Sequence, residues 1–574
     1  MVNLIGIEGA FFEKIIISFD IFDTTIIRPY VAPTDLFTHL ELQFKEDGFS
    51  QQRIDAEKQA RKKHQREITL DEIYHELDEK YHHLKEKEIE MEISLSLPNK
   101  PMLDLYNELR RKGKKTILIS DMYLPTDVIK KILDKCGIKE YDGLFISSQY
   151  GVTKHNGQLY DLIINEMNVS KDDLFHIGDN VHSDYLVPKR KGIQSYLYER
   201  PIDTYFKEHK DEYRFYSRNK TLQRSIIVSL DMINGLNDNI WYDMGRRFGG
   251  PLATSYSLTV NNEDGKGLFL YASRDGHNLK RISEELFPGN RTEYVYAQRL
   301  LLEVLTEEKL PYGKTDVPNK ASNRYQYEKR TVAIERILRF FEKELDIIVP
   351  EDRDEIVTTY NSLSDRIDEL RKKGLSDYTD YMKSMCQYDE IHLIDCTTMK
   401  YSSQKLVEKV LERPVKGHYL VTLGENDNYD HTTMCDWHSP VIGWMNIDIP
   451  EFFLCSPEYP LSGWDNGPVF DTSSKDEEFR ISVYDDVYDG ELDYAKRYKE
   501  IFGEYMIPFD YWSVVNWSKL AAAYGSRYRT ELKKIKWASD PDHKVYMPLI
   551  TGAGSIRNIV KKLFVSLISK INEE

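Results

Sequence analysis

Four apolar runs in the first part of the chain each lead into a side chain suited to phosphoryl chemistry. The run in IIISFDIFDTTIIR ends at Asp20, and the run in KTILISDMYLP ends at Ser120. Lys154 follows GLFISSQYGVT, and DLFHIGDNVHSD places Asp179 and Asp184 after a fourth run. Buried strands of a parallel sheet are apolar along their length, and ligands bind at their carboxyl ends. We therefore expect these five side chains to meet at one edge of a sheet.

These residue types match the needs of phosphoryl transfer. A carboxylate such as that of Asp20 can take a phosphoryl group and form an aspartyl-phosphate, which divides one difficult displacement into two. The hydroxyl group of Ser120 can hold a phosphoryl oxygen, and the ammonium group of Lys154 can balance charge. Mg²⁺ is commonly held by one or two carboxylates, here those after the fourth run. The sequence therefore predicts a Mg²⁺-dependent phosphoryl-transfer site.

The same four segments, in the same order, resemble the motifs of the haloacid dehalogenase superfamily of hydrolases. The matching segments are FDIFDT, LISDMY, the lysine of GVTKHNG, and IGDNVHSD, and the resemblance covers about residues 1–200. It implies that Asp20 is the nucleophile and that Ser120 and Lys154 assist it. The metal ligands that it implies are Asp20, the backbone carbonyl of Phe22, Asp179 and Asp184.

One position departs from the pattern of phosphatases in that family. They usually carry a second aspartate two residues after the nucleophile as general acid/base, but this chain has Phe22 there and Asp23 one position later. Phenylalanine is closer to the dehalogenase branch, which needs no acid for a leaving group. Either Asp23 is the acid, or the cap or the substrate supplies the proton. For Asp121 and Asp23, local capping and a catalytic role are equally compatible with the sequence.

The elements that position these residues follow from the apolar patterning. Alternating strands and helices predict a doubly wound parallel sheet over residues 1–200, with right-handed crossovers. Residues 33–97 have a charged helical pattern and lie where the family inserts a helical cap. The polar, tyrosine-rich residues 201–235 predict an inter-domain junction. Residues 236–490 predict a second α/β domain, Rossmann-like or phosphoribosyltransferase-like, and residues 491–574 predict a C-terminal helical region.

A second candidate site lies in the segment IHLIDCTTMKYSS of that second domain. Asp395 ends an apolar run, and the hydroxyl groups of Thr397, Thr398 and Ser402 follow just before an expected helix. Hydroxyl and backbone N–H groups at a helix N-terminus suit a phosphate group, and the carboxylate suits sugar hydroxyl groups. The competing interpretation is a strand-end turn with capping hydroxyl groups.

This segment loosely resembles the phosphoribosyl diphosphate loop of type I phosphoribosyltransferases, although Cys396 stands where they have a second acid and no glycine is present. By the same resemblance, LYASRDGHNLKRI would supply the diphosphate-binding loop through Arg274, Asp275 and Gly276. TEYVYAQRLLL would be a strand that carries a basic residue. A salt-bridged turn in a generic Rossmann-like binding domain remains the alternative.

The two-part layout resembles proteins encoded among bacterial surface-polysaccharide enzymes, some of which pair a phosphatase with a phosphoribosyl-transferring module. It implies that the second domain moves 5-phosphoribose onto a glycan and that the first domain removes the 5-phosphate. One alternative is a phosphohydrolase of a small phosphorylated metabolite with a non-catalytic C-terminal binding domain. Another is a scaffold protein in which both sites are degenerate.

Composition bounds the partners and the compartment. The net charge of -17 argues against nucleic acid as the main partner. The five cysteines lack metal-type spacing, and their odd number favours a reducing compartment. The chain shows no signal-peptide pattern and no run of 18 apolar residues, so we expect a soluble cytoplasmic protein.

The last part of the chain, SIRNIVKKLFVSLISKINEE, has an apolar stripe at helical spacing, with cations on its other faces. A helix over residues 555–572 could lie on a membrane surface and bring the enzyme to a lipid-linked glycan. The competing interpretation is a helix that docks on the protein's own core or on a dimer partner.

Overall fold

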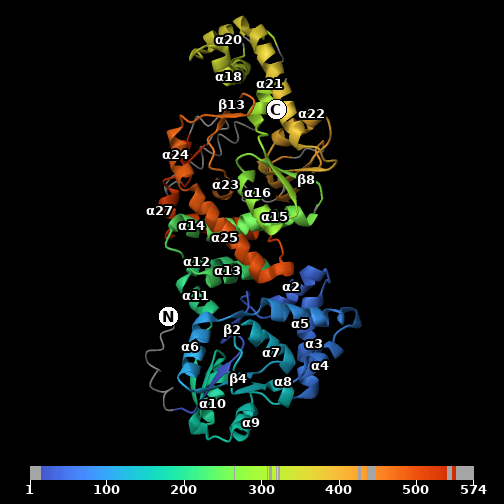
Figure 1. The fold of residues 1–574 in the computed structure, drawn as a ribbon, viewed down its shortest axis with the longest axis vertical. Coiled ribbons are helices and arrows are strands. Elements are labelled where there is room, and N and C mark those ends of the chain that lie inside the picture. The colour runs from blue at the N-terminus through green and yellow to red at the C-terminus, as the bar shows by residue number, and fades with distance from the viewer. Residues whose placement is uncertain are drawn as a thin grey trace. The chain divides into compact units, whose positions relative to one another are not determined.

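Figure 1 shows the fold in a computed structural model. The described residues are 14–263, 266–306, 308, 310, 313–317, 320, 323–424, 428–435, 448–538 and 546–550. The chain divides into two compact units. Unit 1 comprises residues 1–235 and 498–507, and unit 2 comprises residues 236–497 and 508–574.

Unit 1 is built on a five-stranded parallel sheet with the strand order β5-β4-β1-β6-β7. Every residue of β1 and β6 is buried, as expected for central strands covered on both faces. The predicted doubly wound parallel sheet is therefore confirmed. The strands are β1 (Ile16–Asp20), β4 (Lys115–Ser120), β5 (Gly143–Ile146), β6 (Leu174–Gly178) and β7 (Gln194–Leu197).

Helices connect these strands along the chain. Gly113 and Gly137 follow α6 and α7 with φ angles of 77° and 80°, in the left-handed region that commonly ends a helix at glycine. The connecting elements are α6 (Lys100–Arg111), α7 (Thr126–Lys135), α8 (Ser147–Tyr150), α9 (Gln158–Met167), the 3₁₀ turn η2 (Lys171–Asp173), the π-helical turn η3 (Val181–Leu186) and α10 (Val187–Arg190).

The insertion between β1 and β4 is helical, which confirms the predicted cap. Its two ends run antiparallel as β2 (Ile26–Ile27) and β3 (Leu97–Pro98). Inside the cap, buried Arg53 pairs with buried Glu88 at 2.8 Å, and Thr69 begins α4 with a capping box. The cap helices are α2 (Asp35–Phe44), α3 (Phe49–His64), α4 (Leu70–His75), η1 (Glu79–Tyr81) and α5 (Leu84–Leu95).

Residues 201–235, predicted as a junction, form three helices that belong to unit 1. Nearly all of α13 is buried, so this stretch packs into the unit. Residues 498–507, including the short turn η5 (Gly503–Tyr505), return to the same unit. The three helices are α11 (Pro201–Glu208), α12 (Lys210–Arg218) and α13 (Leu222–Asn234).

Unit 2 contains a second five-stranded parallel sheet, with the order β12-β11-β10-β8-β9. The predicted second α/β domain is thereby confirmed. The strands of this sheet are β8 (Leu268–Ala272), β9 (Arg291–Val295), β10 (Ile391–Thr398), β11 (Lys416–Thr422) and β12 (His431–Cys435). Two antiparallel pairs are formed by β13 (Leu461–Trp464) with β14 (Pro468–Phe470) and by β15 (Lys536–Ala538) with β16 (Tyr546–Pro548).

One strand of unit 2 is shorter than predicted. We expected TEYVYAQRLLL to be a single strand, but β9 ends at Val295 and a helix begins at Arg299. The physical reason is the spacing of the leucines, since Leu301 and Leu305 are four residues apart and both are buried in the core of the unit.

The helices of unit 2 cover the sheet and extend beyond it. They are α14 (Ile240–Met244), the π-helical turn η4 (Gly245–Gly249), α15 (Gly250–Glu263), α16 (Gly276–Leu286), α17 (Arg299–Leu305), α18 (Arg324–Phe340), α19 (Glu342–Leu345), α20 (Arg353–Ser362), α21 (Ser364–Met385), α22 (Ser402–Leu411), α23 (Asp448–Leu454), α24 (Lys475–Ser482), most of α25 (Tyr484–Phe502), α26 (Tyr511–Ser518), η6 (Lys519–Ala522) and α27 (Arg529–Leu532).

The predicted amphipathic helix at residues 555–572 lies outside the described residues. Among the helices that the structure does describe, none combines the length and the apolar character needed to cross a bilayer.

Candidate active site and a second cavity

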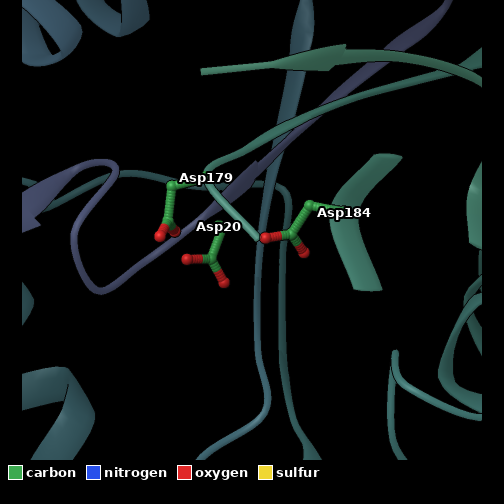
Figure 2. Close-up of side chains that lie close together, drawn as sticks. All are labelled: Asp20, Asp179 and Asp184. Carbon is green, nitrogen blue, oxygen red and sulfur yellow. The ribbon is translucent and has the colours of Figure 1, made fainter. Parts of the chain in front are cut away.

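Three aspartates come together at the carboxyl edge of the sheet in unit 1, as Figure 2 shows. Asp20 ends β1, Asp179 follows β6, and Asp184 lies in the π-helical turn η3. Because β1 and β6 are parallel neighbours, with Phe19 opposite Ile177, the ends of both strands meet. One carboxylate oxygen from each aspartate lies within 4.8 Å of the other two, a spacing that one metal ion could bridge.

Lys154 lies against two of these aspartates. Its ammonium group forms ion pairs with Asp20 and, at 2.7 Å, with Asp184 Oδ1. The loop that carries Lys154 is fixed by Asp121, whose carboxylate accepts hydrogen bonds from the backbone N–H of Lys154 (2.7 Å) and of His155 (3.1 Å). Asp121 therefore has the capping role, and it holds the lysine over the end of β1.

Asp184 is the most firmly held of the three carboxylates. It accepts hydrogen bonds from the backbone N–H of Asn180 at 2.9 Å and pairs with His176 Nε2 at 3.1 Å. His176 is fully buried in β6, and its other ring nitrogen lies 2.8 Å from Ser18 Oγ. Gly178 is required here, since a Cβ atom at this residue would lie 2.5 Å from the Asp184 carboxyl carbon.

The charges at this edge are strongly coupled. Burial raises the pKa of Asp20 well above its usual value, with Lys154 opposing the shift and the other two aspartates adding to it. Burial and the nearby charge of Asp23 raise the pKa of Asp179 to about 6. Burial alone would also raise the pKa of Asp184, but Lys154 and His176 lower it overall. One ammonium group therefore does not fully balance the three carboxylates, and a bound cation would relieve their repulsion.

Ser120 lies beside the nucleophile position. It is the last residue of β4, and in the register of the two strands Asp20 lies opposite Ile119, one residue before it. Ser120 is buried, with 2% of its surface exposed. The fold therefore brings four sequence-predicted elements, the ends of β1, β4 and β6 and the Lys154 loop, to one place.

The segment after β1 explains the unusual residue at position 22. The Phe22 ring lies under the Arg28 guanidinium group, 4.2 Å from its central carbon to the ring centroid. Arg28 is buried and forms a two-pronged pair with Glu92 of the cap helix α5, at 2.9 and 3.1 Å. Phe22 is thus part of the connection between the nucleophile loop and the cap. Its backbone forms an isolated bridge with Ile26.

Asp23 adopts a left-handed backbone conformation with φ of 58°, which costs a non-glycine residue about 1–3 kcal/mol. Its charge acts on Asp179, on Arg28 and on Arg200, so the carboxylate lies near the cluster of three aspartates. Next to it, the Thr24 hydroxyl donates a hydrogen bond to Asp179 Oδ1 at 3.2 Å. The strained turn thus places the Asp23 carboxylate and the Thr24 hydroxyl group near Asp179.

Three residues contribute to this site in ways that the sequence did not predict. They are Thr24, Asp121, which holds the lysine loop, and His176. Thr24 lies inside the first motif, FDIFDT. Its place directly after the two aspartates of that motif is a signal from which its role could have been predicted. His176 gave no signal, because a histidine within an apolar run is most simply a core residue.

Unit 2 has a cavity of about 1440 Å³ at the carboxyl edge of its sheet. Six of the seven residues predicted for the second site line this cavity: Arg274, Asp275, Asp395, Thr397, Thr398 and Ser402. The seventh, Gly276, is not among the described lining residues. A Cβ atom there would lie 2.8 Å from the Tyr271 carbonyl carbon, so this glycine lets α16 begin close against β8.

Both loops of this second site contain a non-glycine residue with positive φ, Arg274 (71°) and Tyr401 (54°). The Tyr294 hydroxyl group holds the first loop in place, because it accepts a hydrogen bond from the backbone N–H of Arg274 at 2.8 Å. The N–H of Tyr401 donates to Thr398 Oγ1 at 2.9 Å, and the N–H of Cys396 donates to Asp395 Oδ1 at 2.8 Å. Asp395 and Thr398 therefore also shape their own turn, as the competing interpretation expected.

Residues in and just after α23 complete the cavity wall. Glu451 of α23 and Cys455 lie beside Asp395 and Arg274. Cys455 is buried, with its sulfur 3.3 Å from the guanidinium group of buried Arg480. No pattern in the sequence placed this segment near the two loops, because it joins them only through tertiary packing.

Comparison with known proteins agrees with the geometry of unit 1. A family model described as haloacid dehalogenase-like hydrolase matches residues 16–190. No curated protein matches the chain. This part of the chain is therefore a haloacid dehalogenase-like hydrolase domain. It contains Asp20, Ser120, Lys154 and the three-aspartate cluster.

Solved structures similar to part of the chain include haloacid dehalogenases and a HAD family enzyme, each at low identity and a low TM-score. An L-2-haloacid dehalogenase from Xanthobacter autotrophicus shares 12% identity, with 34% of this chain and 82% of that chain covered and a TM-score of 0.26. A HAD family enzyme from Bacteroides thetaiotaomicron shares 15% identity, with 33% and 94% covered and a TM-score of 0.25. A 2-haloacid dehalogenase from Pseudomonas syringae shares 12% identity, with 32% and 86% covered and a TM-score of 0.26.

Proposed function

We propose that unit 1 is a Mg²⁺-dependent phosphatase that works through an aspartyl-phosphate on Asp20. The observation that carries the proposal is the meeting of Asp20, Asp179 and Asp184 within 4.8 Å, with Lys154 paired to two of them. The excess negative charge of this cluster fits a divalent cation. The residues that would hold it are the three aspartates, with the Phe22 carbonyl as the ligand that the family resemblance adds. When bound, Mg²⁺ would neutralise charge on the transferred phosphoryl group.

The residues of the chain divide the remaining work. Asp20 attacks phosphorus, Ser120 holds a phosphoryl oxygen, and Lys154 favours the charged form of the nucleophile while it balances the phosphoryl oxygens. Asp23 is our candidate for the acid that protonates the leaving oxygen, because its charge acts on Asp179. The usual acid position holds Phe22, whose ring packs against Arg28 and has no proton to donate. Water then hydrolyses the aspartyl-phosphate and regenerates Asp20.

For unit 2 we propose a phosphoribosyltransferase-like role, so that the whole chain adds phosphoribose to a glycan and then removes its 5-phosphate. The specific support is that six predicted residues line one large cavity. Its hydroxyl-bearing loop before α22 suits the diphosphate of phosphoribosyl diphosphate, and Asp395 suits the ribose hydroxyl groups. In this proposal the protein works in the cytoplasm, with peripheral membrane contact through residues 555–572 and without nucleic acid.

The alternative is a phosphohydrolase of a small phosphorylated metabolite whose unit 2 only binds a ligand. The turn-forming hydrogen bonds of Asp395 and Thr398 are the observation that favours it. Binding of phosphoribosyl diphosphate separates the two proposals, since only the first requires this ligand in the unit 2 cavity.

The test of the phosphatase proposal is phosphate release by the full-length protein with Mg²⁺, from p-nitrophenyl phosphate and from ribose 5-phosphate. We expect Asp20→Asn to abolish release, because an amide cannot form the aspartyl-phosphate. Asp104→Asn, the same change at an exposed position of α6, should release phosphate like the wild type. Equal release by Asp20→Asn and by the wild type would refute the proposal.

A further inference from the structure

The cavity of unit 2 contains an acid that has no part in the function proposed so far. Glu451 lies in the first turn of α23 and lines the cavity together with Asp275 and Asp395. The three carboxylates come from three separate segments: α23, the loop after β8 and the end of β10. All three residues are partly exposed, so a solute in the cavity can reach them.

Two buried polar atoms give independent evidence that this cavity receives a ligand. Ser273 Oγ and Trp464 Nε1 have no hydrogen-bond partner in the described part of the chain, although both residues line the cavity. These residues are only 8% and 5% exposed. Leaving a buried polar group unsatisfied costs about 1–3 kcal/mol, so such groups call for an explanation. A polar ligand that reaches the cavity wall would supply one.

The mixture of groups indicates the chemistry of that ligand. Carboxylates accept hydrogen bonds from hydroxyl groups, an indole offers both an N–H donor and an apolar face, and Trp537 adds a second indole to the wall. The described residues of unit 2 contain no group of three acids close enough to share a metal ion. This spread of acids therefore suits a polyhydroxylated ligand such as a sugar.

We propose that Glu451 is the general base of the second site and takes the proton of the hydroxyl group that attacks the sugar donor. The inference rests on the transferase role proposed for unit 2. The acceptor oxygen forms a bond to the anomeric carbon of phosphoribosyl diphosphate, and the bond from that carbon to the diphosphate oxygen breaks. Diphosphate leaves with the bonding electron pair, and the proton of the acceptor moves to a Glu451 oxygen.

The charged surroundings of Glu451 suit this role. Burial, followed by the charge of Asp448 on the same helix, raises the pKa of Glu451 to about 7. From β10, a hydrogen bond with Thr397 lowers this pKa and the charge of Asp395 raises it, while Arg274 of the β8 loop lowers it. A base that titrates near neutral pH is well placed to take up a proton. Other titratable groups that interact with Glu451 are Asp275, Cys396 and Tyr511.

The other two acids are less suited to proton transfer. Asp395 accepts a hydrogen bond from the backbone N–H of Cys396 at 2.8 Å and another from the Ser403 side chain, so it is already engaged in its own loop. Burial, together with the charges of Glu451 and Asp395, raises the pKa of Asp275 well above its usual value, which disfavours its carboxylate form. Glu451 is the acid that remains.

The test uses the full-length protein, phosphoribosyl diphosphate with Mg²⁺ as donor, and glycerol as a simple hydroxyl acceptor. Donor binding is measured by calorimetry and turnover by diphosphate release, for the wild type, Glu451→Gln and the control Glu355→Gln. Glu355 is an exposed residue of α20 in the same unit and does not line the cavity. The two glutamines replace a carboxylate by an amide of the same shape.

We expect Glu451→Gln to bind the donor as the wild type does but to release diphosphate about 10²–10⁴-fold more slowly, the usual contribution of a general base. Wild-type release should rise with pH up to about 7 and then level off, while the residual rate of Glu451→Gln should not. Glu355→Gln should match the wild type in both measurements.

Diphosphate release by Glu451→Gln at the wild-type rate would overturn the assignment of the base while leaving the transferase role in place. Donor that binds to the wild type without being turned over would overturn the assignment as well. Failure of the wild type to bind the donor would instead refute the transferase role of unit 2, and the inference with it.

Discussion

The two sheets share one arrangement and use it differently. In each, the central strand of a five-stranded parallel sheet carries an aspartate toward its carboxyl end, Asp20 of β1 and Asp395 of β10. In unit 1 two further aspartates converge on Asp20, and a buried lysine pairs with the cluster. In unit 2 the further acids Asp275 and Glu451 line a cavity of about 1440 Å³, and the described acids there form no group of three close enough to share a metal ion.

In our proposals this difference in the placement of the acids, and not in their number, gives the two sites different ligands. Carboxylates that share one point need a cation, because burial and mutual repulsion make their charges costly. Carboxylates that are spread along a wall can each accept a hydrogen bond from a different hydroxyl group. We therefore expect changes at the first site to alter ion binding and phosphate release, and changes at the second site to alter sugar binding.

The largest effect should come from Lys154→Met. It removes the cation that pairs with Asp20 and Asp184, and loss of one partner of a buried ion pair typically costs about 3–5 kcal/mol. Urea unfolding should show that loss, and phosphate release should fall with it. The control Lys191→Met breaks an exposed pair with Asp161 and should cost less than about 1 kcal/mol. Equal losses in the two variants would contradict the compact charge cluster.

The next effect concerns the metal. Mg²⁺ at about 100 times its Kd should raise the free energy of unfolding by about 2.7 kcal/mol, since it binds only the folded cluster. In Asp179→Asn most of this stabilisation should disappear, whereas Asp104→Asn should keep it. Urea unfolding with Mg²⁺ or with EDTA measures both. The same stabilisation by Mg²⁺ in Asp179→Asn and in the wild type would place the ion elsewhere.

A smaller effect is expected at the second site. Asp395→Ala should weaken binding of phosphoribosyl diphosphate at least about tenfold, or about 1.4 kcal/mol, because it removes a carboxylate from the cavity wall. Phosphate release from p-nitrophenyl phosphate should be unchanged. The control Asp465→Ala alters an exposed acid on the rim of the same cavity and should bind normally. If Asp395→Ala also abolished phosphate release, the separation of the two sites would be refuted.

The smallest effect should follow Phe22→Asp, which restores the acid usual in family phosphatases. It removes the ring under Arg28, a contact of about 0.5–2 kcal/mol, so a small loss of stability is expected. Phosphate release should change by less than about tenfold, because Asp23 already supplies the acid. Phe22→Leu separates the loss of the ring from the gain of a carboxylate. A hundredfold gain in Phe22→Asp alone would show that Asp23 is not the acid.

The meeting of Asp20, Ser120 and Asp179 at one edge of the sheet could be predicted from the sequence because its parts are local. Asp20, Ser120 and Asp179 each follow an apolar run, and parallel strands necessarily bring such positions to one edge. Lys154 lies in a connecting loop, and its place depends on hydrogen bonds to Asp121 that strand patterns do not reveal. His176 was missed for a related reason, since its contacts with Ser18 and Asp184 come from sheet packing.

The second site shows where such reasoning ends. Its two loops follow apolar runs, so their meeting at one edge of the sheet could be predicted. Glu451 and Trp464 come from a stretch with little hydrophobic periodicity. Their position depends on packing between segments that are more than fifty residues apart in the chain, so no local pattern encodes it. The polar character of residues 201–235 likewise predicts a junction, whereas in the structure α13 of this stretch is buried in unit 1.

The most direct test of the central claim is to trap the covalent intermediate. Full-length protein with Mg²⁺ and radiolabelled acetyl phosphate is quenched in acid and digested, and the labelled peptide is identified by mass spectrometry. We predict acid-stable, base-labile label on the peptide that carries Asp20, with none in Asp20→Asn. Label on another residue, or label that persists in Asp20→Asn, would contradict the assignment of Asp20 as the nucleophile.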